Sequence, residues 1–240
     1  MKRAQGGPAV ARLREFGHGR DKQIPEETHV KLYGYFRSSA AYRVRIALNL
    51  KKLPYDHEAV HLTREGGWQF REGYRAINPQ KRVPALALST GEVLLQSLAI
   101  IEYLDEVFPE PPLLPADAIE RAHVRAVAQI VACDVHPINN LAVLNYLKGP
   151  LKQDRPTVDD WYRHWTTQGF DAVERLIKPG PYAFGAHATV ADLCLVPQVF
   201  NARRFKVDMA KYPKIAAVDA ACLKLPAFDK ARPENQPDAE

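Results

Sequence analysis

The chain has 240 residues, of which 46% are hydrophobic and 25% charged, a balance typical of a soluble globular protein with one large domain or two small ones. Its formal net charge of +5 comes from scattered Lys and Arg side chains, and charges interrupt the apolar runs short of the roughly 20 residues that cross a bilayer, so we expect neither nucleic acid nor a membrane as partner. The three cysteines, Cys133, Cys194 and Cys222, form no CxxC pair, which argues against a disulfide framework or a zinc site and predicts a reducing, cytoplasmic location.

The chain begins with a segment that shows no pattern of regular structure. Residues 1–29 have no sustained apolar periodicity and are rich in Gly, Arg and Lys, which predicts a mobile N-terminal extension. Its Arg-rich start is similar to an organelle transit peptide, but Glu15, Asp21 and the lack of Ser enrichment argue against one. The segment has no apolar stretch of the kind that secretory signals need, so we expect no secretion.

Residues 30–110 carry the patterns of a small mixed domain. An aromatic-rich strand pattern starts at Val30, and apolar residues recur at helical spacing after it. Short strand patterns and turn residues follow before a clearly amphipathic helix. The predicted elements are a strand from residue 30, a helix over 40–53, a strand over 58–62, a weaker helix over 67–76, strands at 83–88 and 92–95, and a helix over 97–108 with Ser97 as its N-cap.

A proline-rich segment separates this domain from the rest of the chain. Residues 109–117, PEPPLLPAD, contain four prolines, which do not continue a helix, so we place a domain boundary here. Residues 117–240 are predicted to form an all-helical domain, because apolar residues recur along them at helical spacing. Two capping boxes are expected at helix starts, Thr157 with Asp160 and Thr189 with Asp192.

Two adjacent serines, Ser38 and Ser39, stand between the first strand and the first helix. A serine at such a turn is commonly a helix N-cap, and one of the two suffices for that role. A helix start also presents unpaired N–H groups and the positive end of the helix dipole, which favour a bound anion. The pair therefore leaves two interpretations open: caps alone, or a hydroxyl that donates to a bound thiolate or carboxylate.

Two further turns have the composition to recognise a peptide-like ligand. Pro84 opens a strand pattern; an ordinary strand start explains it, and so does a cis-proline that aims the backbone of Val83 at an extended peptide. Gln96 and Ser97 precede the last helix of this domain. Ser97 alone is explained as a cap, and the pair together favours a bound carboxylate.

The order of elements, with a proline before the third strand and a helical domain behind it, resembles the glutathione transferases. The motifs SSAAYRVRIALNLK, NPQKRVPAL, QSLAIIEYLDE, LLPAD, HPINNLAVLNYL, ATVADLCLVPQVFNARRFKVD, YPKI and NQPD are similar to the zeta class and spread over residues 31–238. The resemblance implies an N-terminal thioredoxin-like α/β domain that binds glutathione as cofactor, a C-terminal all-helical domain that binds substrate, and a homodimer.

The resemblance also implies a role for individual residues. Ser38 is the expected partner of the glutathione thiolate and Ser39 a nearby helper, both catalytic, with Ala40 where many members have cysteine. Arg37 and Arg204 are expected to face an acidic substrate. The residues expected to contact glutathione are Ser38, Ser39, Ala40, Ala41, Tyr42, Arg43, Gln69, Val83, Gln96, Ser97, His136, Asn140 and Leu141.

The activity that the resemblance implies is maleylacetoacetate isomerase. In this reaction 4-maleylacetoacetate becomes 4-fumarylacetoacetate during tyrosine and phenylalanine degradation, because a thiolate adds to the cis double bond and leaves after rotation. The alternatives are a maleylpyruvate isomerase, a broader transferase acting on small halo acids, and a non-catalytic glutathione-binding protein. No metal is expected, since the histidines lack ligand spacing, and Trp161, Trp165 and Phe170 are interpreted as core.

Overall fold

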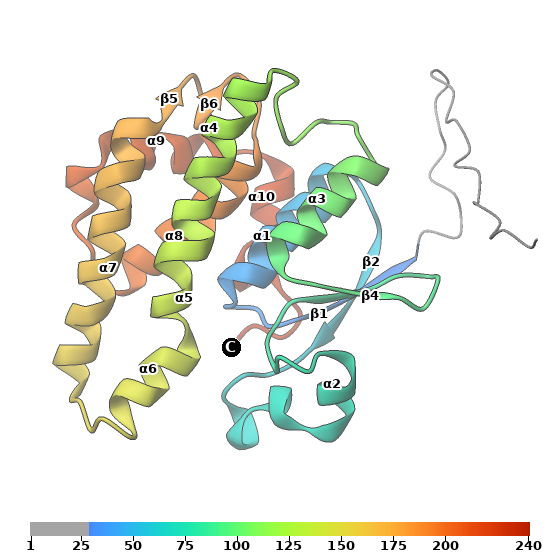
Figure 1. The fold of residues 1–240 in the computed structure, drawn as a ribbon, viewed down its shortest axis with the longest axis vertical. Coiled ribbons are helices and arrows are strands. Elements are labelled where there is room, and N and C mark those ends of the chain that lie inside the picture. The colour runs from blue at the N-terminus through green and yellow to red at the C-terminus, as the bar shows by residue number, and fades with distance from the viewer. Residues whose placement is uncertain (1–28) are drawn as a thin grey trace, which may run out of the picture.

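The structure, a computed structural model, describes residues 29–240 and places a small sheet with its helices beside a bundle of longer helices (Figure 1). The first unit runs in colour from blue to green and the second from green to red. The extension expected over residues 1–29 falls, apart from His29, outside the described residues.

The first half of the chain has the predicted order of elements around a four-stranded sheet. The strand order is β2-β1-β3-β4; β1 and β2 are parallel, and β3 is antiparallel to both of its neighbours. In chain order the elements of this half are β1 (Val30–Gly34), α1 (Ser39–Leu50), β2 (Tyr55–Ala59), two 3-10 turns (Arg64–Gly66 and Trp68–Phe70), α2 (Glu72–Ile77), β3 (Ala85–Ala87), β4 (Val93–Leu95) and α3 (Ser97–Val107).

Several boundaries in this half differ from the sequence prediction: α1 ends at Leu50 and not at residue 53, β3 is shorter than the expected 83–88, and two further elements are displaced. The second strand was expected over 58–62 but lies at Tyr55–Ala59, because it pairs in parallel register with β1 and ends where β1 ends. The helix expected over 67–76 begins only at Glu72. Gly67 has a φ of 102°, outside the helical region, so a separate 3-10 turn precedes α2.

The second half is helical, as predicted, apart from one small pair of strands. The strands Lys178–Pro179 (β5) and Phe184–Gly185 (β6) join two helices. The helices are α4 (Ala118–Gln129), a π-helix (Ile130–Val135), α5 (His136–Asn139), α6 (Leu141–Lys148), α7 (Arg155–Leu176), α8 (Val190–Arg204), α9 (Pro213–Cys222) and α10 (Pro226–Ala231), with 3-10 turns at Met209–Lys211 and Pro233–Asn235.

One of the two predicted capping boxes is confirmed and the other is wrong. The carboxylate of Asp192 accepts from the Thr189 backbone N–H at 2.7 Å and from its hydroxyl at 2.9 Å, which starts α8 as expected. Helix α7 starts three residues earlier than expected, because Asp154 is its N-cap and accepts from the Thr157 N–H at 2.9 Å.

One hydrophobic core joins the two halves, with α1 and α8 at its centre. Helix α1 packs against α3, α8 and α10, and most of α8 is buried. Arg45 on α1 is fully buried; its guanidinium donates to the carbonyls of Ala231 at 3.0 Å and Phe36 at 2.9 Å. The start of α1 is therefore fixed from both halves of the molecule.

One helical stretch among the described residues, Ala118–Lys148, has the length and hydropathy of a membrane span by composition alone. The expectation that charges interrupt every apolar run is wrong here, since only Asp134 is charged between Arg125 and Lys148. In the structure the stretch is divided by a π-helix, and its first helix packs against α8. Length and composition alone are weak evidence of a membrane span, and α4 packs against α7 and α8 of the helical bundle.

Candidate active site

Ser38 lies at the turn between β1 and α1 and is the N-cap of α1. Its backbone is extended (φ −68°, ψ 117°), and its hydroxyl oxygen accepts from the Ala41 N–H at 3.2 Å. This confirms the cap interpretation. Because the oxygen accepts, its proton is left for another partner, and no acceptor for it is found within residues 29–240.

Ser39 is the first residue of α1 and is held from the helical half of the chain. Its side chain is buried, and its oxygen accepts from the Asn201 amide nitrogen at 2.6 Å. The Asn201 amide oxygen in turn accepts from the Arg204 guanidinium at 2.8 Å. Ser39 is therefore not a cap; it is joined through α8 to one of the two arginines expected to face substrate.

The two arginines share one region above the serine turn. The Arg37 guanidinium donates to the Tyr35 hydroxyl at 2.9 Å and lies 5.0 Å from the centre of the Phe36 ring. Burial, and then the charge of Arg37, lower the pKa of Arg204 from its usual value. Neither arginine forms an ion pair with a residue in 29–240. Two cations that act on each other and have no ion-pair partner in the described residues favour a ligand with two carboxylates.

Gln96 and Ser97 form the start of α3, and the N-cap is Gln96 and not Ser97 as expected. Gln96 is the N-cap position and has a φ of 70°, which is uncommon for a residue with a side chain. Ser97 is not the cap, because it is the first helical residue and its hydroxyl accepts from Arg43 at 3.2 Å. The side chain of Gln96 donates to Gln80 at 2.8 Å.

The buried Arg43 connects this helix start to α1. Its side chain is 2% exposed, and two of its three guanidinium nitrogens have no hydrogen-bond partner in the described structure. Burial lowers its pKa from the usual value. A buried cation with unused donors beside the N-terminus of α3 makes this end of the sheet attractive to a carboxylate.

The Val83–Pro84 bond is cis, which is one of the two interpretations that the sequence left open. Tyr74 and Asn78 hold the preceding turn, because both donate to the Arg82 carbonyl, at 2.6 and 2.7 Å. Val83 packs in a cluster with Tyr35 and Phe36, next to the serine turn. Within residues 29–240, its backbone N–H and C=O have no backbone hydrogen-bond partner, so both are available to an extended ligand.

Gln69 is buried in the loop between β2 and α2. Its amide nitrogen donates to the Leu62 carbonyl at 3.4 Å, and its amide oxygen has no partner in the described residues. Gly67 makes this placement possible, because a Cβ at Gly67 would lie 2.5 Å from the Gln69 side chain. Trp68, between the two, packs against the same cluster as Val83.

His136 directly follows the π-helix and is the first residue of α5. Burial, and then the charges of Arg43 and Arg82, lower its pKa to about 3, so its imidazole is neutral near pH 7. Asn140 caps α6: its amide oxygen accepts from Val143 at 3.1 Å and its nitrogen donates to the Pro137 carbonyl at 2.7 Å. Its side chain is therefore already committed. Leu141 is the first residue of that helix.

Contacts link some of the predicted residues into two groups, and Gln69, Val83, Gln96, Asn140 and Leu141 are not joined to either group by these contacts. In one group Arg43 donates to Ser97 and its charge acts on His136. In the other, Asn201 joins Ser39 to Arg204, and the charge of Arg37 acts on Arg204. The side chain of Ser38 contacts the backbone of Ala41. The side chains of Ala40, Ala41 and Tyr42 are buried, and that of Tyr42 also lines a cavity beside Arg204.

Sequence reasoning missed two residues of this region, Asn201 and Tyr35. Asn201 lies three residues before Arg204 on one helix, a spacing that places their side chains together and could have identified it. Tyr35 gives no such signal, because its hydroxyl is positioned only by the turn that follows β1.

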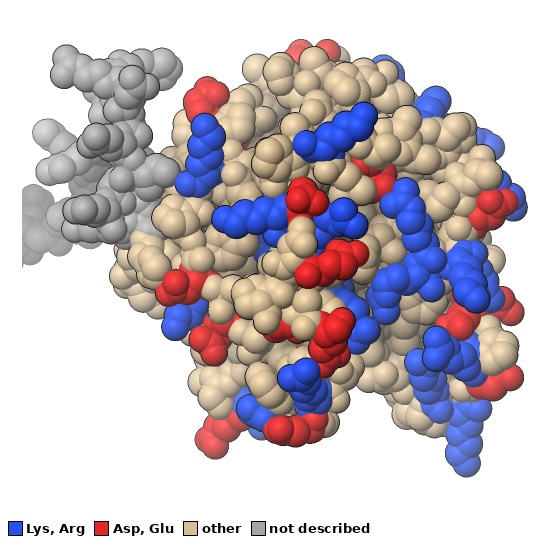
Figure 2. Space-filling view, turned by 180° about the vertical axis from the view of Figure 1, so that it is seen from behind, with Lys and Arg blue, Asp and Glu red and all other residues tan. Residues whose placement is uncertain are grey.

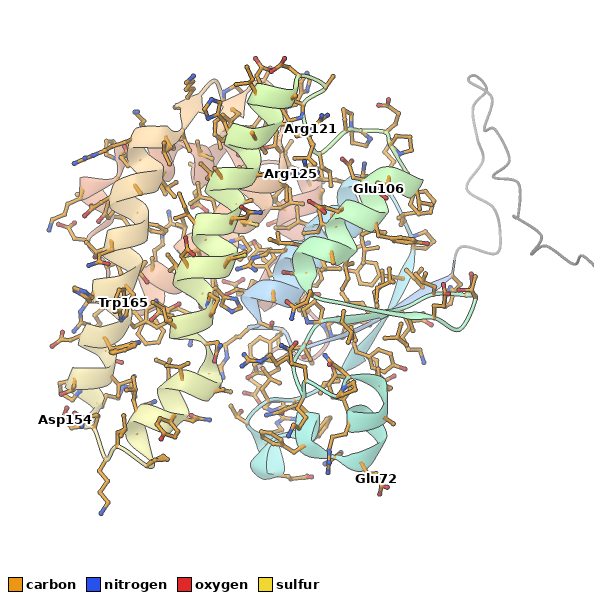
Figure 3. All side chains as sticks on the ribbon, viewed as in Figure 1. Glu72, Glu106, Arg121, Arg125, Asp154 and Trp165 are labelled. Atoms are coloured by element: carbon orange, nitrogen blue, oxygen red, sulfur yellow. The ribbon has the colours of Figure 1, made fainter. Side chains whose placement is uncertain are left out.

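These groups fit a peptide with free carboxylates and a thiol. The starts of α1 and α3 can each bind an anion. Arg43 adds unused donors, and Val83 adds a backbone N–H and C=O without partners. Figure 2 shows the molecule hollowed at its lower edge between two lobes, over which basic and acidic side chains interleave. Figure 3 labels Glu72 on α2 and Asp154 at the start of α7, near the lower ends of the two halves.

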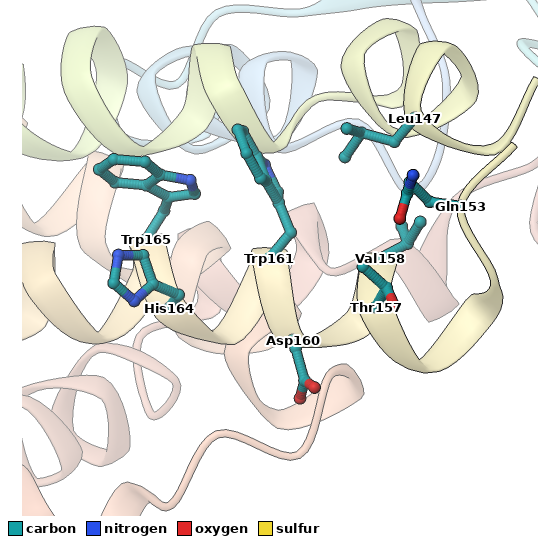
Figure 4. Close-up of a pocket in the computed structure, with 8 residues that line it drawn as sticks. All are labelled: Leu147, Gln153, Thr157, Val158, Asp160, Trp161, His164 and Trp165. Atoms are coloured by element: carbon teal, nitrogen blue, oxygen red, sulfur yellow. The ribbon is translucent and has the colours of Figure 1, made fainter. Parts of the chain in front are cut away.

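Two cavities lie outside the serine turn. One, of about 420 Å³, is lined by α6 and α7 and holds Trp161 and Trp165, which the sequence assigned to the core together with Phe170 (Figure 4). Phe170 is fully buried, whereas both tryptophans are half-buried at this groove. The other, of about 370 Å³, is lined by Arg204 and residues of α8, α9 and the C-terminal segment. No cluster of three metal-binding side chains is found within residues 29–240.

Comparisons with known proteins show the family of the chain. Two family models match the sequence: "Glutathione S-transferase, N-terminal domain" over residues 37–107 and "Glutathione S-transferase, C-terminal domain" over residues 167–218. A probable maleylacetoacetate isomerase of Vibrio cholerae is 51% identical over 211 residues, which are 87% of this chain and 97% of that protein.

Two solved structures have the same architecture. A holo maleyl pyruvate isomerase, described as a bacterial glutathione S-transferase in the zeta class, is 50% identical, with a TM-score of 0.84 over 88% of this chain and 100% of that one. A maleylacetoacetate isomerase of Anaeromyxobacter dehalogenans with bound glutathione is 40% identical, with a TM-score of 0.80 over 89% of this chain and 99% of that one. The chain therefore belongs to the zeta class of the glutathione S-transferase family of enzymes.

Proposed function

We propose that the chain catalyses the glutathione-dependent isomerisation of 4-maleylacetoacetate to 4-fumarylacetoacetate, a step of tyrosine and phenylalanine degradation. The observation that carries this proposal is the pair Arg37 and Arg204, two cations without a carboxylate partner in residues 29–240, beside two serine hydroxyls at a helix start. The similarity to a protein called maleylacetoacetate isomerase supports the same reaction.

The serine turn and the start of α3 would hold glutathione between them. Bound glutathione would supply a thiolate that adds to one carbon of the cis double bond, so that the carbon–carbon bond is single and can rotate until loss of the thiolate restores the double bond as trans. The free backbone of Val83 would pair with the peptide part, and Gln96, Ser97 and Arg43 would face a carboxylate. The hydroxyls of Ser38 and Ser39 would donate to the sulfur.

The free energy needed to stabilise the bound thiolate decides which groups at the serine turn are required. A thiol with a pKa near ~8.5 must be stabilised as thiolate by about 2.7 kcal/mol to lower that pKa by ~2 units. A helix N-terminus supplies roughly 0.3–1 kcal/mol when exposed and up to ~2 when partly buried. A hydrogen bond to a charged group adds about 1.5–3 kcal/mol. The start of α1 alone falls short of the requirement, whereas the range for Ser38 and the start of α1 together includes it.

Arg37 and Arg204 would bind the substrate's carboxylates and stabilise negative charge that develops on its carbonyl oxygen. Their aromatic neighbours support this role, because the Arg37 guanidinium lies against Phe36 and that of Arg204 lies 5.7 Å from the centre of the Phe205 ring. His136 adds no positive charge, since it is neutral near pH 7.

Maleylpyruvate isomerisation is the second candidate reaction. A relative with that name has 50% identity, nearly the same as the 51% of the relative called a probable maleylacetoacetate isomerase. The two diacids differ in length beyond the double bond, so the same serine turn and arginine pair serve both. The segment LAV after HPINN, where the maleylpyruvate enzymes are expected to carry arginines, favours the longer substrate.

The test compares initial rates on both diacids with glutathione, for the wild type and Ser38→Ala. We expect faster turnover of maleylacetoacetate. In the variant we expect a bound-thiol pKa about 1–2 units higher, and a rate at neutral pH about 10–100-fold lower. Full activity and an unchanged thiol pKa in the variant would contradict the role of Ser38. Retention on immobilised glutathione without turnover of either diacid or of halo acids would mark a binding protein.

We further propose a cytoplasmic homodimer with small molecules as its only ligands. The absence of paired cysteine spacing supports the location, and the family resemblance supports the dimer. Light scattering of the purified protein measures the assembly, and a mass near that of one chain would contradict it.

A further inference from the structure

The orientation of the Asn201 side-chain amide is fixed by its neighbour. Arg204 donates to the amide oxygen of Asn201 at 2.8 Å, and a guanidinium has donors only. The oxygen of this amide must therefore face Arg204, although the two ends of an amide are otherwise hard to tell apart. Its nitrogen is then the end that faces Ser39, at 2.6 Å.

This fixes the hydrogen-bond direction at Ser39. The amide nitrogen of Asn201 has no acceptor capacity, so the Ser39 oxygen must accept and cannot donate to Asn201. Ser39 and Asn201 are 5% and 8% exposed, which leaves bulk water little access to this contact. No acceptor for the Ser39 proton is found within residues 29–240. The proton therefore remains for a ligand at the serine turn.

We propose that Asn201 is a positioning residue, which makes the Ser39 hydroxyl a hydrogen-bond donor to the sulfur of a thiol bound at the start of α1. The inference rests on the proposed function, since it concerns the same thiol. It assigns the two serines different supports. Ser38 is directed by the backbone of its own helix, through Ala41, whereas Ser39 is directed by Arg204 through Asn201.

The substitution Asn201→Asp tests this direction with almost no change of shape. The new carboxylate would still accept from Arg204 through one oxygen, but its second oxygen can only accept, so Ser39 would turn its proton toward it. The Ser39 lone pairs would then face the sulfur. We expect the bound-thiol pKa, measured from the ultraviolet absorbance of the thiolate as the pH is varied, to rise by about one unit or more. The melting temperature of the variant checks that it is folded.

The negative charge that Asn201→Asp adds also raises a thiol pKa, so the experiment needs Ser39→Ala and the double variant. If Asn201 acts through Ser39, Asn201→Asp shifts the pKa clearly less in the Ser39→Ala background. Equal shifts in both backgrounds would overturn the inference. Asn235→Asp makes the same chemical change at an exposed site and should leave the pKa unmoved.

A second variant, Asn201→Ala, removes the amide without adding charge. It should raise the thiol pKa by a smaller amount than Asn201→Asp, because Ser39 is then free to turn. If the wild-type protein with bound glutathione shows no ultraviolet absorbance band of a thiolate, the proposed function and this inference are both overturned. A wild-type band that neither Asn201 variant moves overturns the inference and leaves the proposed function standing.

Discussion

The hydroxyls of Ser38 and Ser39 are held by different parts of the molecule. The Ser38 contact spans three residues of one helix, and the strand-to-helix turn made it predictable from the sequence. The Ser39 contact comes from Asn201, 162 residues further along the chain. No local pattern could have separated the two roles, because the partner of Ser39 is set by how α8 packs on α1.

His136 gives the molecule a pH-dependent stability. Its pKa is about 3 in the folded chain, because burial and Arg43 disfavour the charged form, against 6.5 for an ordinary histidine. Between these two values the unfolded chain binds the proton and the folded chain does not. This contribution to stability is therefore present above about pH 6.5 and is lost as the pH falls below it.

We expect His136→Gln to weaken this dependence. Melting temperatures measured from about pH 7 down to about pH 4 should fall less steeply in the variant than in the wild type, because glutamine takes up no proton. His123→Gln, at an exposed histidine, should keep the wild-type slope. Parallel curves for the wild type and His136→Gln would contradict the assignment.

At the scale of elements, the helices with a strong apolar period were predictable and the contacts that end or divide them were not. The periods of α1, α3 and α4 are visible in the sequence. The end of β2 is set by its register with β1, and the start of α3 by the positive φ of Gln96. The π-helix has no sequence signature, since it depends on α7 lying against it.

Gly169 on α7 allows the close approach that shapes the π-helix. A Cβ at this position would lie 2.2 Å from the Val135 methyl carbon Cγ2, and valine has one strongly preferred rotamer in a helix. Gly169→Ala should therefore force α7 and the π-helix apart and destabilise the fold by about 1–3 kcal/mol. Since His136 follows the π-helix directly, we also expect weaker glutathione binding. Urea unfolding and calorimetric titration measure the two effects.

The matched control removes the clash from the other side. In the double variant Val135→Ala with Gly169→Ala, the new methyl group has room, so stability should recover relative to Gly169→Ala alone. Val135→Ala by itself should cost stability through the lost methyl groups. If the changes in unfolding free energy of the two substitutions simply add, the contact between positions 135 and 169 is not the cause of the destabilisation by Gly169→Ala.

At the scale of the whole molecule, the C-terminal segment returns from the helical half to the serine turn. The carboxylate of Asp238 accepts from the Phe36 N–H at 3.0 Å, and its other oxygen lies 3.3 Å from His57. Glu240 contacts His61 at 3.0 Å and Arg64 at 2.6 Å. The loop on one side of the site is thus tied to the end of the chain, a contact no sequence pattern predicted.

Asp238→Ala tests whether this tie holds the serine turn in place. Phe36 is 5% exposed and immediately precedes Arg37 and Ser38, so its N–H would lose a buried acceptor, at a cost of about 1–3 kcal/mol. We expect faster hydrogen exchange at the Phe36 amide and a higher KM for glutathione. Asp238→Asn keeps an oxygen for that N–H, so its exchange and KM should stay near the wild type. If Asp238→Asn behaves like Asp238→Ala, the charge of Asp238 beside His57 matters more than the hydrogen bond to Phe36. If neither variant changes exchange or KM, the serine turn is held by its own strand and helix.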